Sequence, residues 1–254
     1  MINNNKKEIK FPALQGGSGD EKSVVVIALV LSAIQSYGAD LFQDGKLRDI
    51  KKGDLIMSTD TIGGYPIYQD DGRWQFARSA LSHSTGTDII KMGEVFLDYY
   101  QGSELLARQW LNATLTVGDA SNWNGTPCSP DHLVVRNKGK GKQDNCMTID
   151  PRIINVGATP TLFLTIALTN TGSMGRYYRL NLSVYASQLG IKNSGVGDWT
   201  KEDLKVDVKK QEVLDRLTKW AELLQDASIQ AFDFSKPQDV YAKIPLLTSL
   251  LPAQ

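Results

Sequence analysis

The amino-acid sequence predicts an α+β fold: a mostly antiparallel sheet of about six to eight strands, with a C-terminal amphipathic helix packed on one face. Two periodicities lead to this prediction. Apolar residues recur every second position through the middle of the chain, and every third or fourth position near its end. Strands followed by one late helix are typical of α+β domains. With 41% apolar and 22% charged residues among 254, the composition is that of a globular protein.

The N-terminal region divides into a polar leader, residues 1–22, and an apolar run, residues 23–38, that has no charged side chain. The run is shorter than the roughly 20 residues of a membrane-spanning helix. It suits the apolar part of a secretory signal, with a cleavage site after Gly38. The leader is long for such a signal and its charges nearly cancel, so an uncleaved anchor and a cytosolic core segment are the alternatives. We expect an extracytoplasmic protein, periplasmic or secreted, cleaved or anchored by this segment.

Residues 39–90 are rich in turn-forming side chains and are expected to contain a hairpin. Tyr65–Gln69 and Arg73–Arg78 flank an Asp-Asp-Gly sequence, and Asp-Gly favours the positive φ angles of a tight turn. The Ser/Thr/Gly-rich residues 79–87, which include His83, are predicted to form a loop.

Residues 91–254 are expected to form the α+β core. The predicted strands are residues 92–100, 109–117, 132–136, 146–149, 161–169 and 178–184. In the last two strands leucine, isoleucine and valine occupy alternate positions, so that one face of the pair is apolar. Near the C-terminus, residues 244–252 are apolar and are expected to pack over the core as a tail.

A helix of about 20–25 residues is predicted after Asp207, which lies at the N-cap position. Thr200 and Asp203 form a capping-box-like start just before it. Its apolar stripe consists of Val213, Leu217, Trp220, Leu224, Ala227 and Ala231. We expect this stripe to contact the apolar face of the 161–169 and 178–184 strands.

Cys128 and Cys146 are the only two cysteines, and in an exported protein two lone cysteines most simply form a disulfide. Two free thiols are one alternative. A zinc site completed by His83 and His132 is another, although the ligand spacings typical of zinc sites are absent.

The position of Cys146 in its hairpin has a geometric consequence. If residues 138–142 cap a hairpin centred near Lys140, Cys146 lies opposite Val134 and not opposite Cys128. The bridge would then have to join the second strand to the loop before the first one.

No motif in the sequence identifies a reaction. A catalytic set of Cys128 as nucleophile, His132 as base, and Asp131 or Asn145 as the orienting group could be assembled, but a disulfide would remove its thiol. Phosphate-binding, dinucleotide-binding and nucleophile-elbow motifs are absent. We therefore expect no cofactor and no metal.

The candidate ligand-binding residues cluster near the cysteines: Trp123, Arg136, Lys138, Lys140 and Lys142. Lysine and arginine number 28, equal to aspartate and glutamate, and a net charge of zero argues against nucleic acid as a partner.

The sequence favours an exported or envelope-anchored, non-enzymatic binding domain. We expect its partner to be a protein or an envelope component, with membrane contact only through Ser23–Gly38. The first alternative is a small hydrolase or transferase with a site around His132. The second is a cytosolic α+β protein whose basic hairpin contacts phosphate groups.

Overall fold

The computed structural model describes residues 39–69, 73–83, 90–115, 128–139, 144–173, 175–192, 194–233 and 239–252, with the backbone alone at His83. The predicted leader and the apolar run Ser23–Gly38 lie outside the described residues, so both stay predictions. No helix among the described residues is long and apolar enough to cross a membrane.

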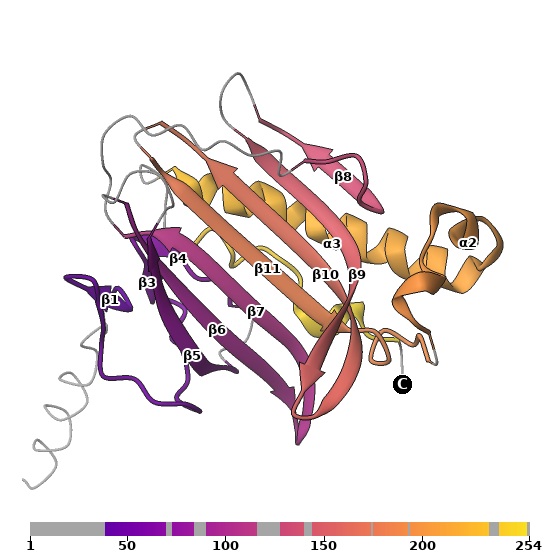
Figure 1. The fold of residues 1–254 in the computed structure, drawn as a ribbon, viewed down its shortest axis with the longest axis horizontal. Coiled ribbons are helices and arrows are strands. Elements are labelled where there is room, and N and C mark those ends of the chain that lie inside the picture. The colour runs from indigo at the N-terminus through magenta and orange to yellow at the C-terminus, as the bar shows by residue number, and fades with distance from the viewer. Residues whose placement is uncertain are drawn as a thin grey trace, which may run out of the picture. The chain divides into compact units, whose positions relative to one another are not determined.

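A seven-stranded antiparallel sheet is the centre of the fold, with the strand order β5-β6-β7-β11-β10-β9-β8 (Figure 1). Its strands are β5 (Trp74–His83), β6 (Lys91–Gln101), β7 (Glu104–Thr114), β8 (Val134–Asn137), β9 (Asn145–Val156), β10 (Thr159–Thr171) and β11 (Tyr177–Tyr185). Two short two-stranded sheets precede it in the chain. One pairs β1 (Phe42–Gln43) with β2 (Lys46–Leu47), and the other pairs β3 (Thr61–Ile62) with β4 (Tyr65–Pro66). The predicted fold class is confirmed.

The helices follow the sheet in the chain. They are the 3-10 turn η1 (Val196–Asp198), α2 (Lys201–Val206), the long helix α3 (Val208–Phe232) and the 3-10 turn η2 (Leu247–Leu250). Thr200 and Asp203 form the predicted capping box of α2. Asp207 caps α3 by accepting a hydrogen bond from the backbone N–H of Lys210 at 3.0 Å. Both caps satisfy N–H groups that a helix start leaves without partners.

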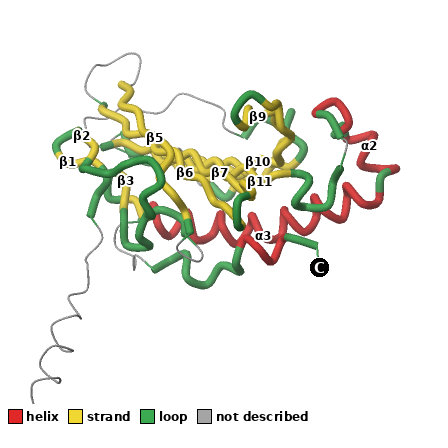
Figure 2. The backbone as a smooth tube through the Cα atoms, turned by 90° about the horizontal axis from the view of Figure 1, so that it is seen from below, coloured by secondary structure: helices red, strands yellow, loops and turns green. Residues whose placement is uncertain are grey.

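The helix α3 packs along one face of the sheet (Figure 2) and contacts β9 and β10. The register places Ile166 opposite Leu182, and both belong to the same buried cluster as the apolar stripe of α3. Trp220 is 4% exposed, and its indole N–H donates to the Pro245 carbonyl oxygen at 2.9 Å. The predicted contact between the stripe and the leucine face is confirmed. The C-terminal tail packs over the core as expected, with Leu247 and Leu250 buried.

The strand pairing in the N-terminal third differs from the prediction. The predicted hairpin of Tyr65–Gln69 with Arg73–Arg78 does not form, because β4 pairs with β3 and β5 pairs with β6. Residues 79–83, predicted as loop, continue β5 because the adjacent strand β6 supplies their hydrogen-bond partners. Pairing with the next strand of the chain overrides the local preference of serine for turns.

The strand β9 is longer than residues 146–149 because it continues through Pro151. Proline lacks the N–H that a residue in a central strand donates, so a proline inside a strand needs an explanation. Here β8 pairs with β9 only as far as Ile149, so that Pro151 lies on an outer edge where no donor is needed.

The β8–β9 register is also shifted from the predicted one. Cys146 lies opposite Asn137, and Val134 lies opposite Ile149. The axis of the hairpin is therefore further along the chain than a centre at Lys140 implies. The conclusion that the two cysteines cannot form a plain cross-strand pair is nevertheless correct, since Cys128 precedes β8.

Candidate functional site

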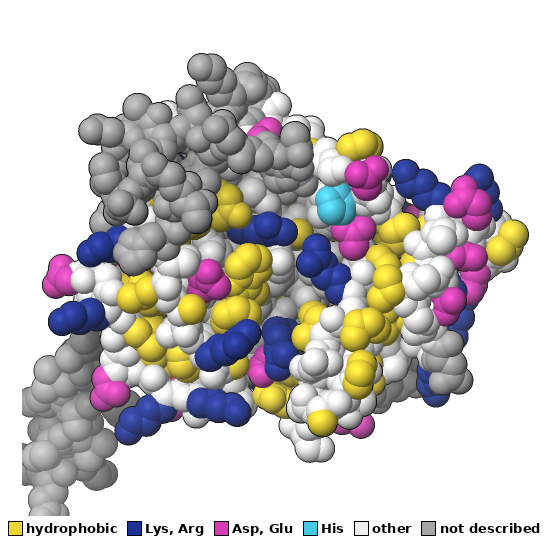
Figure 3. Space-filling model, in the orientation of Figure 1, with side chains coloured by type: hydrophobic (Ala, Val, Ile, Leu, Met, Phe, Trp, Pro, Cys, Tyr) yellow, Lys and Arg dark blue, Asp and Glu magenta, His cyan; other side chains and the backbone are white. Residues whose placement is uncertain are grey.

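The face of the sheet opposite α3 carries charged, other polar and hydrophobic side chains side by side (Figure 3). Successive side chains of a strand point to opposite faces. Residues between the leucines and valines of the core therefore point to this face, which we call the open face. Figure 3 shows lysine and arginine side chains gathered around its middle.

A ladder of stacked side chains crosses four adjacent strands of the open face. The guanidinium of Arg78 lies 4.0 Å from the ring centroid of Phe96 on the next strand. Phe96 stacks with Trp110 at 6.3 Å between centroids, and the Arg179 guanidinium lies 5.5 Å from the Trp110 ring. Guanidinium groups are attracted to the negative face of an aromatic ring. We call these four residues the cation–aromatic ladder.

The register explains how the ladder forms. Arg78 lies opposite Phe96, and Phe96 lies opposite Trp110. A register shift between Phe76 and Arg78 interrupts the alternation of β5. Phe76 therefore stays in the core while Arg78, two positions later, turns to the open face. A bulge often re-aims a side chain in this way.

A hollow of about 560 Å³ lies beside the ladder. Its size falls within the range of small-molecule sites. Its lining residues are Lys52, Ala77, Arg78, Phe96, Asp98, Arg108, Trp110, Arg152, Ile153, Ile154, Asn155, Thr165, Asn181 and Ser183.

The floor of this hollow is made of small polar side chains. The hydroxyls of Thr165 and Ser183 are hydrogen-bonded to each other at 2.9 Å and are both buried. The Asn181 amide oxygen accepts a hydrogen bond from Arg179 Nε at 3.1 Å. Its amide NH2 group makes no hydrogen bond to another described residue.

The hollow has an excess of positive charge. Asp98 binds Arg108 through both carboxylate oxygens, at 2.6 and 3.1 Å, and this bond raises the pKa of the guanidinium. Lys52, Arg78 and Arg152 lie around the same space, and none of them has a carboxylate partner among the described residues. Arg152 is exposed, and no described group accepts a hydrogen bond from it. Unneutralised guanidinium groups in a hollow attract anions.

The cysteine prediction is confirmed, since Cys128 and Cys146 form a disulfide with Cα atoms 5.6 Å apart. This distance is typical of disulfides. Because Cys128 is bonded to Cys146, it has no thiol to act as the nucleophile of a catalytic set. A disulfide fits an oxidising, extracellular environment.

His132 is paired with Asp150 through its Nδ1 atom, and the same carboxylate accepts the Leu133 N–H at 3.1 Å. The register places Asp150 opposite Thr165, so the pair lies one strand from the floor of the hollow. The Asp131 carboxylate instead accepts a hydrogen bond from Ser129 at 2.9 Å. No hydroxyl or thiol of a described residue is hydrogen-bonded to His132.

The structure describes two of the four basic residues that were predicted to bind ligand, Arg136 and Lys138. Arg136 Nε lies 3.0 Å from Glu222, and Lys138 Nζ lies 2.6 Å from Asp226, so both charges are paired with α3. Their side chains thus point to the helix side of the sheet. Trp123, Lys140 and Lys142 lie outside the described residues.

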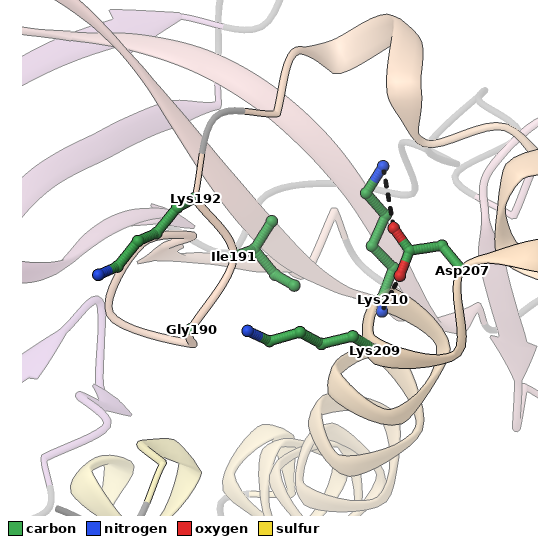
Figure 4. A pocket seen from close by; sticks show the side chains of 6 residues that line it. All are labelled: Gly190, Ile191, Lys192, Asp207, Lys209 and Lys210. Carbon is green, nitrogen blue, oxygen red and sulfur yellow. Dashed lines mark hydrogen bonds and ion pairs between the residues drawn. The ribbon is translucent and has the colours of Figure 1, made fainter.

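A second hollow, of about 390 Å³, lies at the start of α3 (Figure 4). Lys209 points across it towards Gly190. Lys210 Nζ lies 3.7 Å from Asp207 and donates to the Asp198 carbonyl oxygen at 2.8 Å. These groups are used in capping the helix and holding the preceding turn, which leaves less charge for a ligand than the open face has.

The sequence reasoning missed the ladder and the hollow. Phe96 and Trp110 gave a readable signal, since both are large aromatic residues at the polar positions of alternating strands. The bulge that redirects Arg78 left no such signal. No protein-family model, curated protein or solved structure matches the chain.

Proposed function

We propose that this chain is an exported, non-enzymatic binding domain that takes an anionic ligand into the hollow on the open face of its sheet. The observation that supports this most is the excess of arginine and lysine over acidic side chains around the hollow, which lies beside the cation–aromatic ladder. Charge complementarity is the property by which such a surface selects its ligand.

The state of the arginines supports binding over a purely structural role. Arg108 is already neutralised by Asp98, whereas Arg78 is held over Phe96 and Arg152 is exposed. A guanidinium stacked on a ring keeps the N–H groups along its edge free for a carboxylate or phosphate. The stacked Arg78 is therefore oriented before the ligand arrives, which lowers the entropy cost of binding.

Export is supported by the disulfide together with the uncharged run Ser23–Gly38. The test is to express the chain with its own N-terminus in a bacterium and to sequence the N-terminus of the mature protein. A start close to Ala39 in the extracytoplasmic fraction is expected. An intact chain with reduced cysteines in the cytoplasm would contradict export.

Binding is tested by isothermal titration with four small anions at low salt: D-galacturonate, glucose 6-phosphate, hexanoate and inorganic phosphate. At least one should bind, and Arg152→Ala should weaken it about tenfold or more, because a hydrogen bond to a charged group contributes roughly 1.5–3 kcal/mol. Lys219→Ala is the matched control, since this exposed lysine on α3 carries the same charge away from the open face. Failure of all four anions to bind would overturn the proposal.

A hydrolase or transferase around His132 is the second candidate function. The His132–Asp150 pair favours it, since a carboxylate that orients an imidazole is part of many general-base sites. A nucleophile or water next to the imidazole would still be required. Loss of a measured hydrolytic activity in His132→Gln, with Arg152→Ala fully active, would support this alternative over binding at the hollow.

A further inference from the structure

We infer that the ligand of the open face is a hydroxyl-bearing anion of the sugar-acid or sugar-phosphate kind. The inference rests on the proposed function and adds the chemical class of the ligand. It follows from combining the charge of the walls with the hydroxyl and amide groups of the floor, which together favour such a ligand over an anion without hydroxyl groups.

The walls select for negative charge. Arg78 and Arg152 both border the hollow with guanidinium groups that have no described carboxylate partner, and Lys52 adds a third cation. A guanidinium presents two parallel N–H groups that match a carboxylate or a phosphate. A neutral ligand would leave these charges with water as their only partner, so it would gain little from the walls.

The floor selects for hydroxyl groups. Thr165 and Ser183 are 3% and 5% exposed, and each hydroxyl has an acceptor lone pair beyond the bond that joins them. Asn181 adds amide N–H donors. An aliphatic chain laid over this floor would remove water from the remaining polar positions of these groups without replacing its hydrogen bonds, which is unfavourable. A ligand with several hydroxyls would form such hydrogen bonds itself.

The register brings the two kinds of group together. Ser183 lies opposite both Arg108 and Thr165, so the paired guanidinium and the two hydroxyls form one cross-strand row. The neighbouring row places Asn181 opposite Trp110. One ligand can therefore contact a hydroxyl row, an amide and the aromatic edge of the ladder at once. A sugar ring has hydroxyls along its rim and C–H groups on its faces, and an aromatic side chain can pack against such a face.

The experiment compares four ligands that separate charge from hydroxylation: D-galacturonate, glucose 6-phosphate, D-galactose and hexanoate, each measured by isothermal titration. Galacturonate or glucose 6-phosphate should bind at least tenfold more tightly than both galactose and hexanoate. Whichever of the two binds better identifies the anionic group as carboxylate or phosphate.

Two variants examine the two halves of the inference. Arg152→Ala should weaken the hydroxylated anion about tenfold or more, with Lys219→Ala unchanged. Ser183→Ala should weaken the same ligand several-fold and leave hexanoate unaffected. Melting curves of each variant in the absence of ligand identify any loss of folding, and the exposed position of Arg152 keeps that variant usable if Ser183→Ala is unstable.

The outcomes separate this inference from the proposed function. Equal binding of hexanoate and galacturonate, both weakened by Arg152→Ala, would overturn the sugar-anion class and leave anion binding standing. Binding of galactose as tight as that of galacturonate would also overturn it. Absence of binding by every anion would overturn the inference and the proposed function together.

Discussion

Truncation of Trp220 should remove a large part of the stability of the protein, because this side chain joins α3 to the segment after β4 and to the C-terminal tail. Trp220 is 4% exposed and meets the Tyr68 ring edge-on at 5.8 Å between centroids. Deleting a buried large aromatic residue costs about 3–5 kcal/mol. The hydrogen bond to the Pro245 carbonyl oxygen adds about 1 kcal/mol. We expect Trp220→Ala to lower the free energy of unfolding by about 4–6 kcal/mol.

The assay is urea denaturation followed by circular dichroism, with Leu223→Ala as the control. Leu223 is three residues further along α3 and is 49% exposed, so its truncation should cost less than about 1 kcal/mol. A similar dependence on urea concentration in the three proteins would show that the same cooperative unit unfolds. A loss below about 1 kcal/mol in Trp220→Ala, or one equal to that of Leu223→Ala, would refute the packing of α3 described above.

Three further predictions concern other parts of the structure. Reduction of the Cys128–Cys146 bridge should lower the free energy of unfolding by about 3 kcal/mol, and a thiol reagent should find no reactive thiol in the unreduced, denatured protein; two thiols would refute the bridge. Burial raises the pKa of Tyr241 to about 12 from 10.0, so the folded protein keeps a proton that the unfolded chain loses. Stability should therefore fall between pH 10 and 12 by up to about 1.4 kcal/mol per pH unit, measured by urea midpoints, and a flat profile would contradict this. Asp60→Ala should lower the free energy of unfolding by about 3 kcal/mol in thermal or urea unfolding, because the buried carboxylate binds Arg48 through two hydrogen bonds of 2.9 Å. An unchanged free energy of unfolding in this variant would show that the pair adds no stability.

The fold could be predicted from the sequence where the periodicity of apolar residues agrees with the tertiary packing. The alternation in β10 and β11 and the stripe of α3 each match a face that is buried in the structure. Prediction failed where the pairing with neighbouring strands decides the local structure. Ser79–His83 is a strand because β6 lies beside it, and Pro151 is tolerated because its edge of β9 is free.

The candidate site could be read only in part. The disulfide followed from the number of cysteines, whereas the hollow required knowing which strands are neighbours. Trp110 and Asn181 are 71 positions apart in the chain and lie opposite each other only because β7 pairs with β11. Arg78 points to the same face because of a β-bulge, and the residues around that bulge do not predict it. Such long-range pairing is not encoded in any short motif.

The most direct test of ligand binding at the open face uses the tryptophan indole N–H groups as reporters. The Trp110 indole donates to Glu94 at 3.1 Å on the open face, and the Trp220 indole donates to Pro245 on the opposite side of the sheet. Their nitrogen–proton NMR signals, assigned with single Trp→Phe variants, should be followed while D-galacturonate or glucose 6-phosphate is added. We predict that the Trp110 signal shifts and saturates while the Trp220 signal stays in place. A shift confined to Trp220, or no shift of Trp110 at millimolar ligand, would contradict a binding site on the open face.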